Sequence, residues 1–366
     1  SASEDFIKGV VSLRLIKQEC EIAEIEKACD IGYEMHYNAM KMMRLGMVEQ
    51  ELVGVMEGIS ISKGLMPSFP IILSQNGETL HNHSHHQILT QGRLVVIDAG
   101  AETNSNYTSD FTRTLPASGR FTQQQKEIYN IVAAANNLAI SIARPGITYT
   151  EVHQAASRVM AQGLVDLGLM KGSADEIVAA GAHSLFMPHG LGHNMGMDVH
   201  DMEDLGENYV GYDENHKRSS QFGLGSLRMG KMLQAGHVVT VEPGIYFIPA
   251  LIEQWEREGT NVGFINFEKL KSMTVDEFAD WLAENCQSDD APWTWWFDTN
   301  YCKKCEPITC KIEATNIGIE PLYPEQEVDC AYCELENKCR FCPDLAGIPA
   351  IKTTIKMWLK EEANND

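Results

Sequence analysis

Residues 189–201, HGLGHNMGMDVHD, carry the strongest chemical pattern of the chain. Three histidines, His189, His193 and His200, are spaced by four and seven residues. The glycines between them allow the backbone to approach its neighbours closely. Neutral imidazole is a common ligand for divalent metals. Packing alone does not explain three histidines interleaved with glycine and flanked by aspartate, so this segment predicts a metal or catalytic site.

A pair of carboxylates forms a second candidate. Asp98 ends the apolar run LVVID, Asp110 lies in SDFTRT, and the residues between them are turn formers. If the chain folds back near Asn104, the two aspartates lie opposite each other on antiparallel strands, with Cβ atoms about 5 Å apart. Two divalent ions about 3.5–4 Å apart would relieve their repulsion. The alternative is two unrelated turn aspartates.

Glu242 is the third candidate. It ends an apolar run in TVEPGIYF and is followed by Pro243 and Gly244. Burying a carboxylate in such a run is costly unless it is paired or binds a metal. The alternative is a carboxylate at a strand end that reaches solvent.

The elements that must position these residues form two similar units. Helical spacing of apolar residues predicts a helix over residues 19–44, ended by Gly46, and a second helix over 48–61. Strand-like runs follow at 68–73 and 93–100. The order then repeats, with helices at 123–143 and 149–167 and a strand-like run at 237–247. Two helix–helix–strand units predict an α+β domain with an internal duplication.

Together these motifs resemble the prolidase/aminopeptidase P family, which has the pita-bread fold shared with creatinase and methionine aminopeptidase. The resemblance covers residues about 6–270 and includes RLIKQECEIAEIEKAC, LHNH, IDAG, SDFTRT, the segment from His189, and TVEPGIY. Met195 stands where the family prefers Leu, Ile or Val. The resemblance implies a metallopeptidase that cleaves Xaa-Pro bonds, with prolidase and aminopeptidase P activity both open.

The resemblance also implies a set of metal ligands. Asp98 would bind one ion, Asp110 would bridge two, and His193 would bind the second with Glu242 beside it. Glu242 would also take the proton of the water between the ions. Hard oxygen ligands with one histidine suit Mn²⁺, with Zn²⁺ and Co²⁺ as alternatives.

Further histidines receive roles from the same resemblance. His189 and His200 would orient the substrate, a proline-containing peptide, and steady the tetrahedral intermediate. His81, in the LH motif, would bind substrate. Three neighbours have no family role and are expected to lie in a solvated loop: His83, His85 and His86.

Two departures from the family pattern affect the expected activity. Full-length members carry an additional N-terminal domain, whereas this sequence starts at the helix that leads into the catalytic domain. The family also supplies a fifth ligand from a late Gly-x-Arg-x-Glu motif. After Glu242 only Arg257 and Arg340 occur, neither in such a motif, and Glu268 is a poor substitute. A weak Xaa-Pro peptidase and a non-catalytic pita-bread binding protein both stay open, whereas creatinase lacks these ligands and methionine aminopeptidase lacks this histidine arrangement.

Composition changes sharply near Lys271. All 12 histidines precede it and eight of the 10 cysteines follow it. Residues 272–366 contain 19 acidic and 8 basic residues, a net charge of -11, half of the total of -22. A catalytic domain over 1–271 and an acidic, Cys-rich domain of no recognised family over 272–366 are therefore expected.

The second domain contains three Cys-x-x-Cys pairs. Without a secretion signal, such pairs favour structural Zn²⁺ over disulfides or free thiols. The candidate ligands are Cys302, Cys305, Cys330, Cys333, Cys339 and Cys342.

The net charge of -22 argues against nucleic acid and anionic membranes as partners. No apolar run reaches the roughly 18 residues that span a bilayer, and the first residues lack a signal-peptide pattern. A cytoplasmic protein is expected, as a monomer or a homo-oligomer.

Overall fold

The computed structural model describes residues 3–271, which belong to one compact unit. The first half contains α1 (Glu4–Leu15), α2 (Glu19–Met42), α3 (Glu49–Lys63), β1 (Ile72–Ser74), β2 (Leu94–Ala99) and β3 (Phe111–Pro116). The second half contains α4 (Gln123–Ile142), α5 (Tyr149–Asp166), α6 (Ala174–Ala179), α7 (Glu207–Gly211), α8 (Pro249–Glu258), α9 (Phe267–Lys271) and the short 3₁₀ helices η1 (Ala182–Leu185), η2 (Glu203–Leu205) and η3 (Leu224–Ser226). None of the helices within 3–271 is long and apolar enough to cross a membrane.

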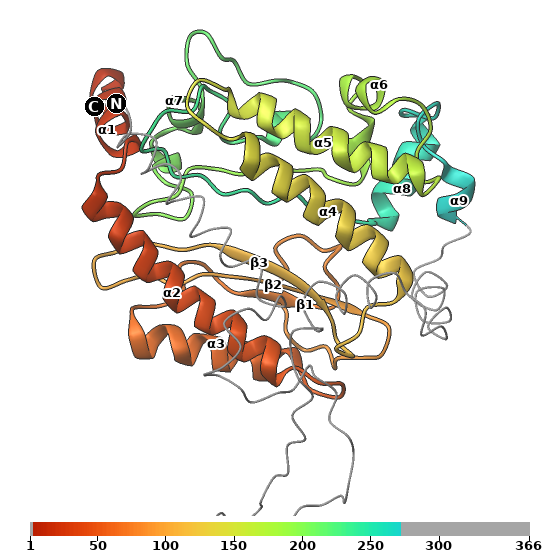
Figure 1. Cartoon of the computed structure of the whole chain (residues 1–366), viewed down its shortest axis with the longest axis horizontal. Helices are drawn as coiled ribbons and strands as arrows, with labels where there is room; N and C mark the ends of the chain where they lie inside the picture. The colour runs from red at the N-terminus through yellow and green to blue at the C-terminus, as the bar shows by residue number, and fades with distance from the viewer. Residues whose placement is uncertain (1–2, 272–366) are drawn as a thin grey trace, which may run out of the picture. The chain divides into compact units, whose positions relative to one another are not determined.

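The three strands form an antiparallel sheet in the order β1-β2-β3 (Figure 1). Along β2, Val95, Ile97 and Ala99 are buried, and they alternate with partly exposed residues that include Asp98. Since successive side chains of a strand point to opposite faces, Asp98 lies on the face away from this core.

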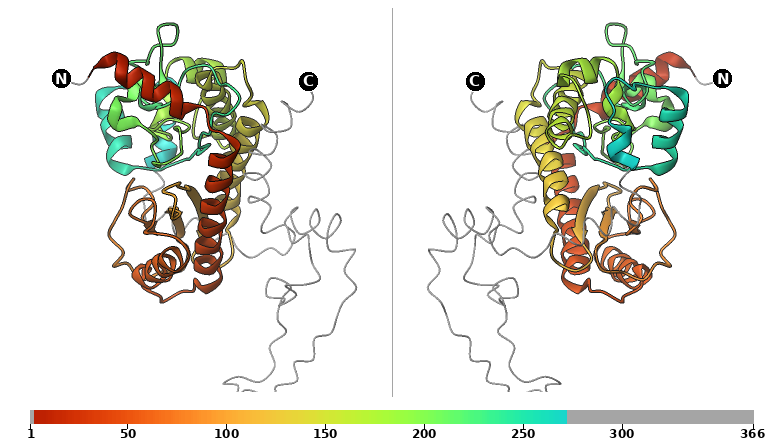
Figure 2. Two further views of the ribbon diagram at one scale, coloured as in Figure 1. Left: turned by 90° about the vertical axis from the view of Figure 1, so that its left-hand side faces the viewer. Right: turned by 90° about the vertical axis from the view of Figure 1, so that its right-hand side faces the viewer.

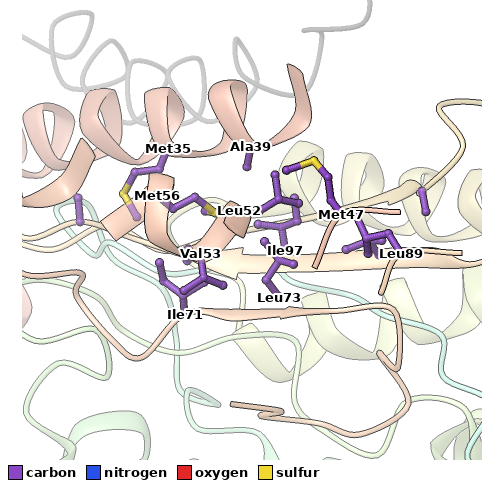
Figure 3. Packing of buried hydrophobic residues seen from close by; sticks show 14 residues of the cluster. Met35, Ala39, Met47, Leu52, Val53, Met56, Ile71, Leu73, Leu89 and Ile97 are labelled. Atoms are coloured by element: carbon purple, nitrogen blue, oxygen red, sulfur yellow. The ribbon is translucent and has the colours of Figure 1, made fainter. Parts of the chain in front are cut away.

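The core of the first half fixes which way β2 faces. Met35 of α2 and Leu52 and Met56 of α3 pack in one cluster with Leu73 and Ile97 of the sheet (Figure 3). All five side chains are fully buried. The hydrophobic face of the α2–α3 pair therefore covers one side of β2, and polar groups lie on the other side.

Two of the long helices, α4 and α5, begin with reciprocal capping hydrogen bonds. At the start of α5, the Glu151 backbone N–H donates to Thr148 Oγ1 at 3.2 Å, and the Thr148 N–H donates to Glu151 Oε2 at 2.9 Å. Thr122 and Gln125 form the same arrangement at α4. Each cap satisfies N–H groups that have no partner inside the helix.

The second half packs around the α4–α5 pair, whose helices lie side by side (Figure 1). They approach closely at Gly163, where a Cβ atom would lie 2.5 Å from Ile131. Tyr149 and Met160 of α5 share a buried cluster with Leu191 from the His-rich segment. Figure 2 shows α2, α3 and the sheet as one group, whereas α1 lies with the elements of the second half, where it packs against Met202 and Val210. The His-rich segment belongs to this second group.

The sequence predicted the four long helices well, and one strand prediction is wrong. The four observed helices begin and end within two residues of the predicted bounds. Helix α1 was not predicted, and β1 begins only at Ile72. Residues 237–247 form no strand. Their backbone instead pairs irregularly with 186–195, through bonds such as Thr240 N–H to His193 O at 2.9 Å and Glu242 N–H to Leu191 O at 2.8 Å.

The reason is steric. Gly192 lies so close to the opposite segment that a Cβ atom there would be 2.1 Å from the Thr240 carbonyl oxygen. Pro243 also removes a donor from the pairing. Within residues 3–271 the duplication is therefore visible in the helix pairs, but the second unit has no regular sheet to match β1-β2-β3.

Several histidines away from the candidate ligands are buried. His153 and His183 are 1% and 3% exposed, and their rings lie edge to face with centroids 6.3 Å apart. Burial is the main cause that lowers the pKa of His153 to about 3 and that of His183 to about 4. Burial also lowers the pKa of His36 to about 4. These imidazoles are neutral in the folded chain and become charged on unfolding below their ordinary pKa of about 6.5.

We expect the free energy of unfolding to fall as pH is lowered from about 7 to about 5. Below the unfolded pKa the unfolded chain binds more protons than the native chain, so each buried histidine removes about 1–2 kcal/mol of stability over that range. His183→Gln should flatten the pH dependence measured by chemical denaturation, whereas His86→Gln, at an exposed position, should not. An unchanged slope in His183→Gln would contradict this assignment.

Candidate metal centre

The first two carboxylates come from the β2–β3 hairpin. Asp98 pairs with Thr112 across the sheet, and Asp110 lies two residues before Thr112. The prediction that Asp98 and Asp110 stand directly opposite each other is therefore wrong, although both lie on the same face as diagonal neighbours. The cause is that the chain reverses around Ser105, one residue later than predicted, so Gly100 rather than Asp98 stands across from Asp110. The Asp98 carboxyl still lies beside the side chains of Thr112 and Asp110.

The third and fourth candidates come from the paired segments of the second half. Thr240 Oγ1 accepts a hydrogen bond from the His193 N–H at 3.0 Å and donates to Glu242 Oε1 at 2.7 Å. His193 Nδ1 lies 2.9 Å from Asn194 O, so the other ring nitrogen is free to face the carboxylates. His193 Nε2 is 3.3 Å from both Asp110 Oδ2 and Glu242 Oε1. The four predicted ligands thus lie next to one another.

The cluster is crowded with negative charge. Burial, followed by the charges of Asp110 and Glu242, raises the pKa of Asp98 well above its ordinary value. Burial also raises the pKa of Glu242 to about 7, with Asp110 adding to the shift and His193 opposing it. Burial opposes charge on His193, but its bond to Asp110 and the charges of Asp110 and Glu242 raise its pKa to about 9. Without bound cations, the chain reduces the negative charge of these carboxylates only by keeping protons on them and on His193.

The donor set fits divalent metal ions. Asp98 Oδ1 is buried and has no hydrogen-bond partner among the described residues. Two ligands about 2.1 Å from one ion, at roughly right angles, would lie about 3 Å apart, close to the 3.3 Å spacing of His193 from the two carboxylates. Within residues 3–271, no three His, Cys, Asp or Glu side chains converge on a common point as they stand. Binding would therefore need small side-chain shifts.

The two auxiliary histidines, His189 and His200, lie on either side of His193 in the sequence and differ in exposure. The His200 ring lies 4.1 Å from that of His193, and its side chain is 41% exposed. His189 packs edge-on against Tyr246 at 5.4 Å, with Nδ1 2.8 Å from Gly190 O and Nε2 buried without a partner among the described residues. Burial lowers the pKa of His189, and the charge of His81 contributes.

The loop that carries His81 is only partly as predicted. His81 is exposed and adopts a left-handed backbone with φ of 56°, and it lies near enough to His189 to affect its charge. His83 and His86 are exposed as expected. His85 is not solvated: it is 8% exposed, and its Nδ1 lies 3.0 Å from the Leu73 carbonyl oxygen, so it ties the loop to β1.

A buried ion pair anchors the His-rich segment. Lys17 Nζ lies 2.6 Å from Asp201 Oδ2, with the two side chains 2% and 1% exposed. Arg14 binds the other oxygen of Asp201 at 2.6 Å. Gly196 leaves the room for this pair, because a Cβ there would lie 2.7 Å from Asp201 Oδ2. The junction of α1 and α2 thus holds the end of the VHD motif.

Sequence reasoning missed several of the residues that support the site. Thr240 could have been found, since it lies two residues before Glu242 and so shares its face in an extended segment. Glu203, which contacts His200, lies at a spacing of three residues. Arg228, which binds Glu203, gave no local signal in the sequence.

The profile of metallopeptidase family M24 matches residues 23–274. The chain belongs to this family. Among curated M24 relatives, human Xaa-Pro dipeptidase is 34% identical over 270 residues, covering 72% of this chain and 53% of the relative. A probable Xaa-Pro aminopeptidase of Verticillium alfalfae is 36% identical over 271 residues, covering 73% and 56%. The chain therefore spans about half the length of the curated relatives it matches.

Solved M24 structures resemble the chain as well. Proline aminopeptidase P II from Yersinia pestis superposes with a TM-score of 0.58 and 38% identity, covering 66% of this chain and 51% of that one. A single-residue (Glu to Ala) variant of Escherichia coli aminopeptidase P in complex with substrate gives a TM-score of 0.53 and 30% identity, covering 74% and 62%. The mixed α/β architecture of this chain is thus that of the aminopeptidase P structures.

The Cys-rich second domain and its candidate zinc ligands lie outside the described residues. The domain boundary near residue 271 likewise stays a prediction.

We expect Asp110→Ala and His193→Ala to lose divalent metal binding while the chain stays folded. Each removes one donor from a cluster in which His193 bonds to Asp110. Metal content and circular dichroism of the purified variants would check this, with Asp175→Asn, at an exposed aspartate paired with Arg158, as the control. Wild-type metal loading in either alanine variant would remove that residue from the ligand set.

Proposed function

We propose that this M24 chain hydrolyses Xaa-Pro peptide bonds with the help of two divalent metal ions, most simply Mn²⁺. The observation that carries the proposal is the meeting of Asp98, Asp110, His193 and Glu242 from separate segments of the chain. The named relatives support the substrate class, since they include an Xaa-Pro dipeptidase and Xaa-Pro aminopeptidases. The same site would serve for hydrolysis of proline-containing dipeptides or of longer peptides.

The roles of the four ligands follow from their chemistry. Asp98, Asp110, His193 and Glu242 would hold the ions, which when bound acidify water and polarise a carbonyl. Glu242 accepts a hydrogen bond from Thr240, and its side chain is 36% exposed. Burial raises the pKa of Glu242 to about 7 in the metal-free chain, and bound cations would lower it, so the carboxylate would be ionised and able to accept a proton near neutral pH.

The histidines would act on the substrate. His189 has one ring nitrogen fixed by Gly190 and the other buried without a partner in the described chain, so it is poised to bond to a bound peptide. His200 adjoins His193 and is partly exposed. Donors placed beside the reacting carbonyl stabilise the oxyanion that develops there. His81 would contact the substrate from the neighbouring loop.

A second candidate function is an impaired or non-catalytic M24 protein that binds peptides. The supporting observation is that no Gly-x-Arg-x-Glu motif follows Glu242 in this sequence. Glu268 does not replace that glutamate, because it is exposed on α9, whose Phe267 and Leu270 pack into the cluster beside α5. One fewer negative charge between two dications would weaken the second ion.

We expect any hydrolysis of Xaa-Pro dipeptides and tripeptides to require added divalent metal, with Mn²⁺ the most effective ion. The reason is that the carboxylates and the imidazole gathered at the site are metal donors. Turnover before and after exhaustive chelation would check this, with matched Xaa-Ala peptides as the control. Full activity after chelation would exclude the proposed mechanism.

Metal stoichiometry separates the two candidates within the same experiment. One tightly bound ion with a weak or empty second site, together with little turnover, is expected if the fifth carboxylate is missing. Two tightly bound ions with full turnover would show that another residue completes the site.

We also propose that the six paired cysteines of residues 272–366 bind structural Zn²⁺. The support is the spacing of the three Cys-x-x-Cys pairs. We expect the 366-residue chain to contain zinc that Cys330→Ser and Cys333→Ser remove and Asp110→Ala does not. Cysteines oxidised in pairs, with no zinc bound, would refute this proposal.

A further inference from the structure

We propose that Glu203 is a positioning residue that fixes the ring of His200 for reaction, and that Arg228 in turn holds Glu203. The inference rests on the proposed function, since His200 acts on substrate only if the chain is a peptidase. It adds to that function two residues outside the candidate set of metal ligands.

The contact between Glu203 and His200 is built by the backbone. His200 Nδ1 lies 3.2 Å from Glu203 Oε2, and the Glu203 N–H donates to the His200 carbonyl oxygen at 3.2 Å. Between them Met202 adopts a left-handed conformation with φ of 65°, which is costly for a residue with a side chain. Met202 is 2% exposed and packs with Val11 and Leu15 of α1, so the core holds the turn in place.

The bond selects one nitrogen of the His200 ring. A carboxylate can only accept, so Nδ1 must carry the proton that it shares with Glu203. Nε2 is then the nitrogen left for the substrate, as an acceptor while the ring is neutral and as a donor once the ring is protonated. Because the ring lies 4.1 Å from that of His193, a change of ring orientation would move this nitrogen relative to the candidate metal centre.

Arg228 fixes the carboxylate itself. Its Nη1 forms an ion pair with the same Oε2 of Glu203 that faces His200. The backbone at Arg228 is held close to Gly211, where a Cβ would lie 1.7 Å from the Arg228 carbonyl oxygen. The Glu203 side chain is only 12% exposed, so its charge-assisted bonds are little screened by solvent.

A purely structural role for the segment is the alternative, and Glu207 distinguishes the two. Glu207 carries the same charge as Glu203 and lies 3.8 Å from the same Arg228, as well as 2.9 Å from Arg218. No contact between Glu207 and His200 is present among the described side chains. Glu207→Gln therefore perturbs the same ion network without touching the histidine.

Kinetics of the variants on Xaa-Pro peptides provide the first test. Glu203→Ala should lower kcat by about 10- to 100-fold, as for other residues that orient a histidine, with KM and metal content close to wild type. Glu203→Gln should lose less, because its amide oxygen can still accept from Nδ1, and Glu207→Gln should match wild type. Arg228→Ala should add little to Glu203→Ala, because it acts through the same carboxylate. Equal losses in Glu203→Ala and Glu207→Gln would overturn the proposal.

A spectroscopic test does not depend on activity. Long-range ¹H–¹⁵N spectra of the metal-free, ¹⁵N-histidine-labelled chain at mildly alkaline pH report which ring nitrogen carries the proton, and His200→Gln assigns the signal. His200 should be protonated on Nδ1 in wild type and in Glu207→Gln, and mixed in Glu203→Ala. The same tautomer in Glu203→Ala would overturn the proposal. If wild type hydrolysed no Xaa-Pro peptide, the proposed function would fail while these spectra would still decide the role of Glu203.

Discussion

Repulsion among three carboxylates is the constraint on which the rest of the site depends. Asp98, Asp110 and Glu242 share a small volume with one imidazole, and burial raises the pKa of Asp98 and Glu242 rather than letting both ionise. Left alone, such side chains would turn apart toward water. The hairpin fixes the first two by register and the Thr240 hydroxyl fixes the third, so the backbone forces together charges that only cations can compensate.

Close backbone packing brings the halves of the ligand set into contact. A side chain at Gly192 would collide with the Thr240 carbonyl, and one at Gly190 would lie 2.5 Å from the Leu227 Cα. The same glycines that let His193 reach the carboxylates prevent a regular strand ladder along 189–196. The irregular pairing is thus a consequence of the site, because a regular ladder would need side chains where there is no space.

The sequence predicted what depends on local pattern and missed what depends on distant partners. Helical spacing located the four long helices, and the histidine spacing and apolar run located His193 and Glu242. The relation of Asp98 to Asp110 was misjudged because the chain reverses around Ser105 rather than Asn104, and a shift of one residue in the turn changes every partner across the hairpin. His85 was expected in solvent because its neighbours are polar, whereas a single carbonyl of β1 binds it in a buried position.

Ion pairs, rather than a strand ladder, hold the segment around His200. Asp201 is bound by Lys17 from the α1–α2 junction, 184 residues away in sequence, and Glu203 is bound by Arg228. A buried ion pair adds little net stability, because desolvation offsets the attraction, but loss of one partner leaves a buried charge and costs about 3–5 kcal/mol. Loss of one partner therefore destabilises the protein more than the intact pair stabilises it. This suits a segment that must keep one histidine at a fixed distance from a centre already crowded with charge. It also makes α1 part of the site, although no residue of α1 approaches the metal donors within the described contacts.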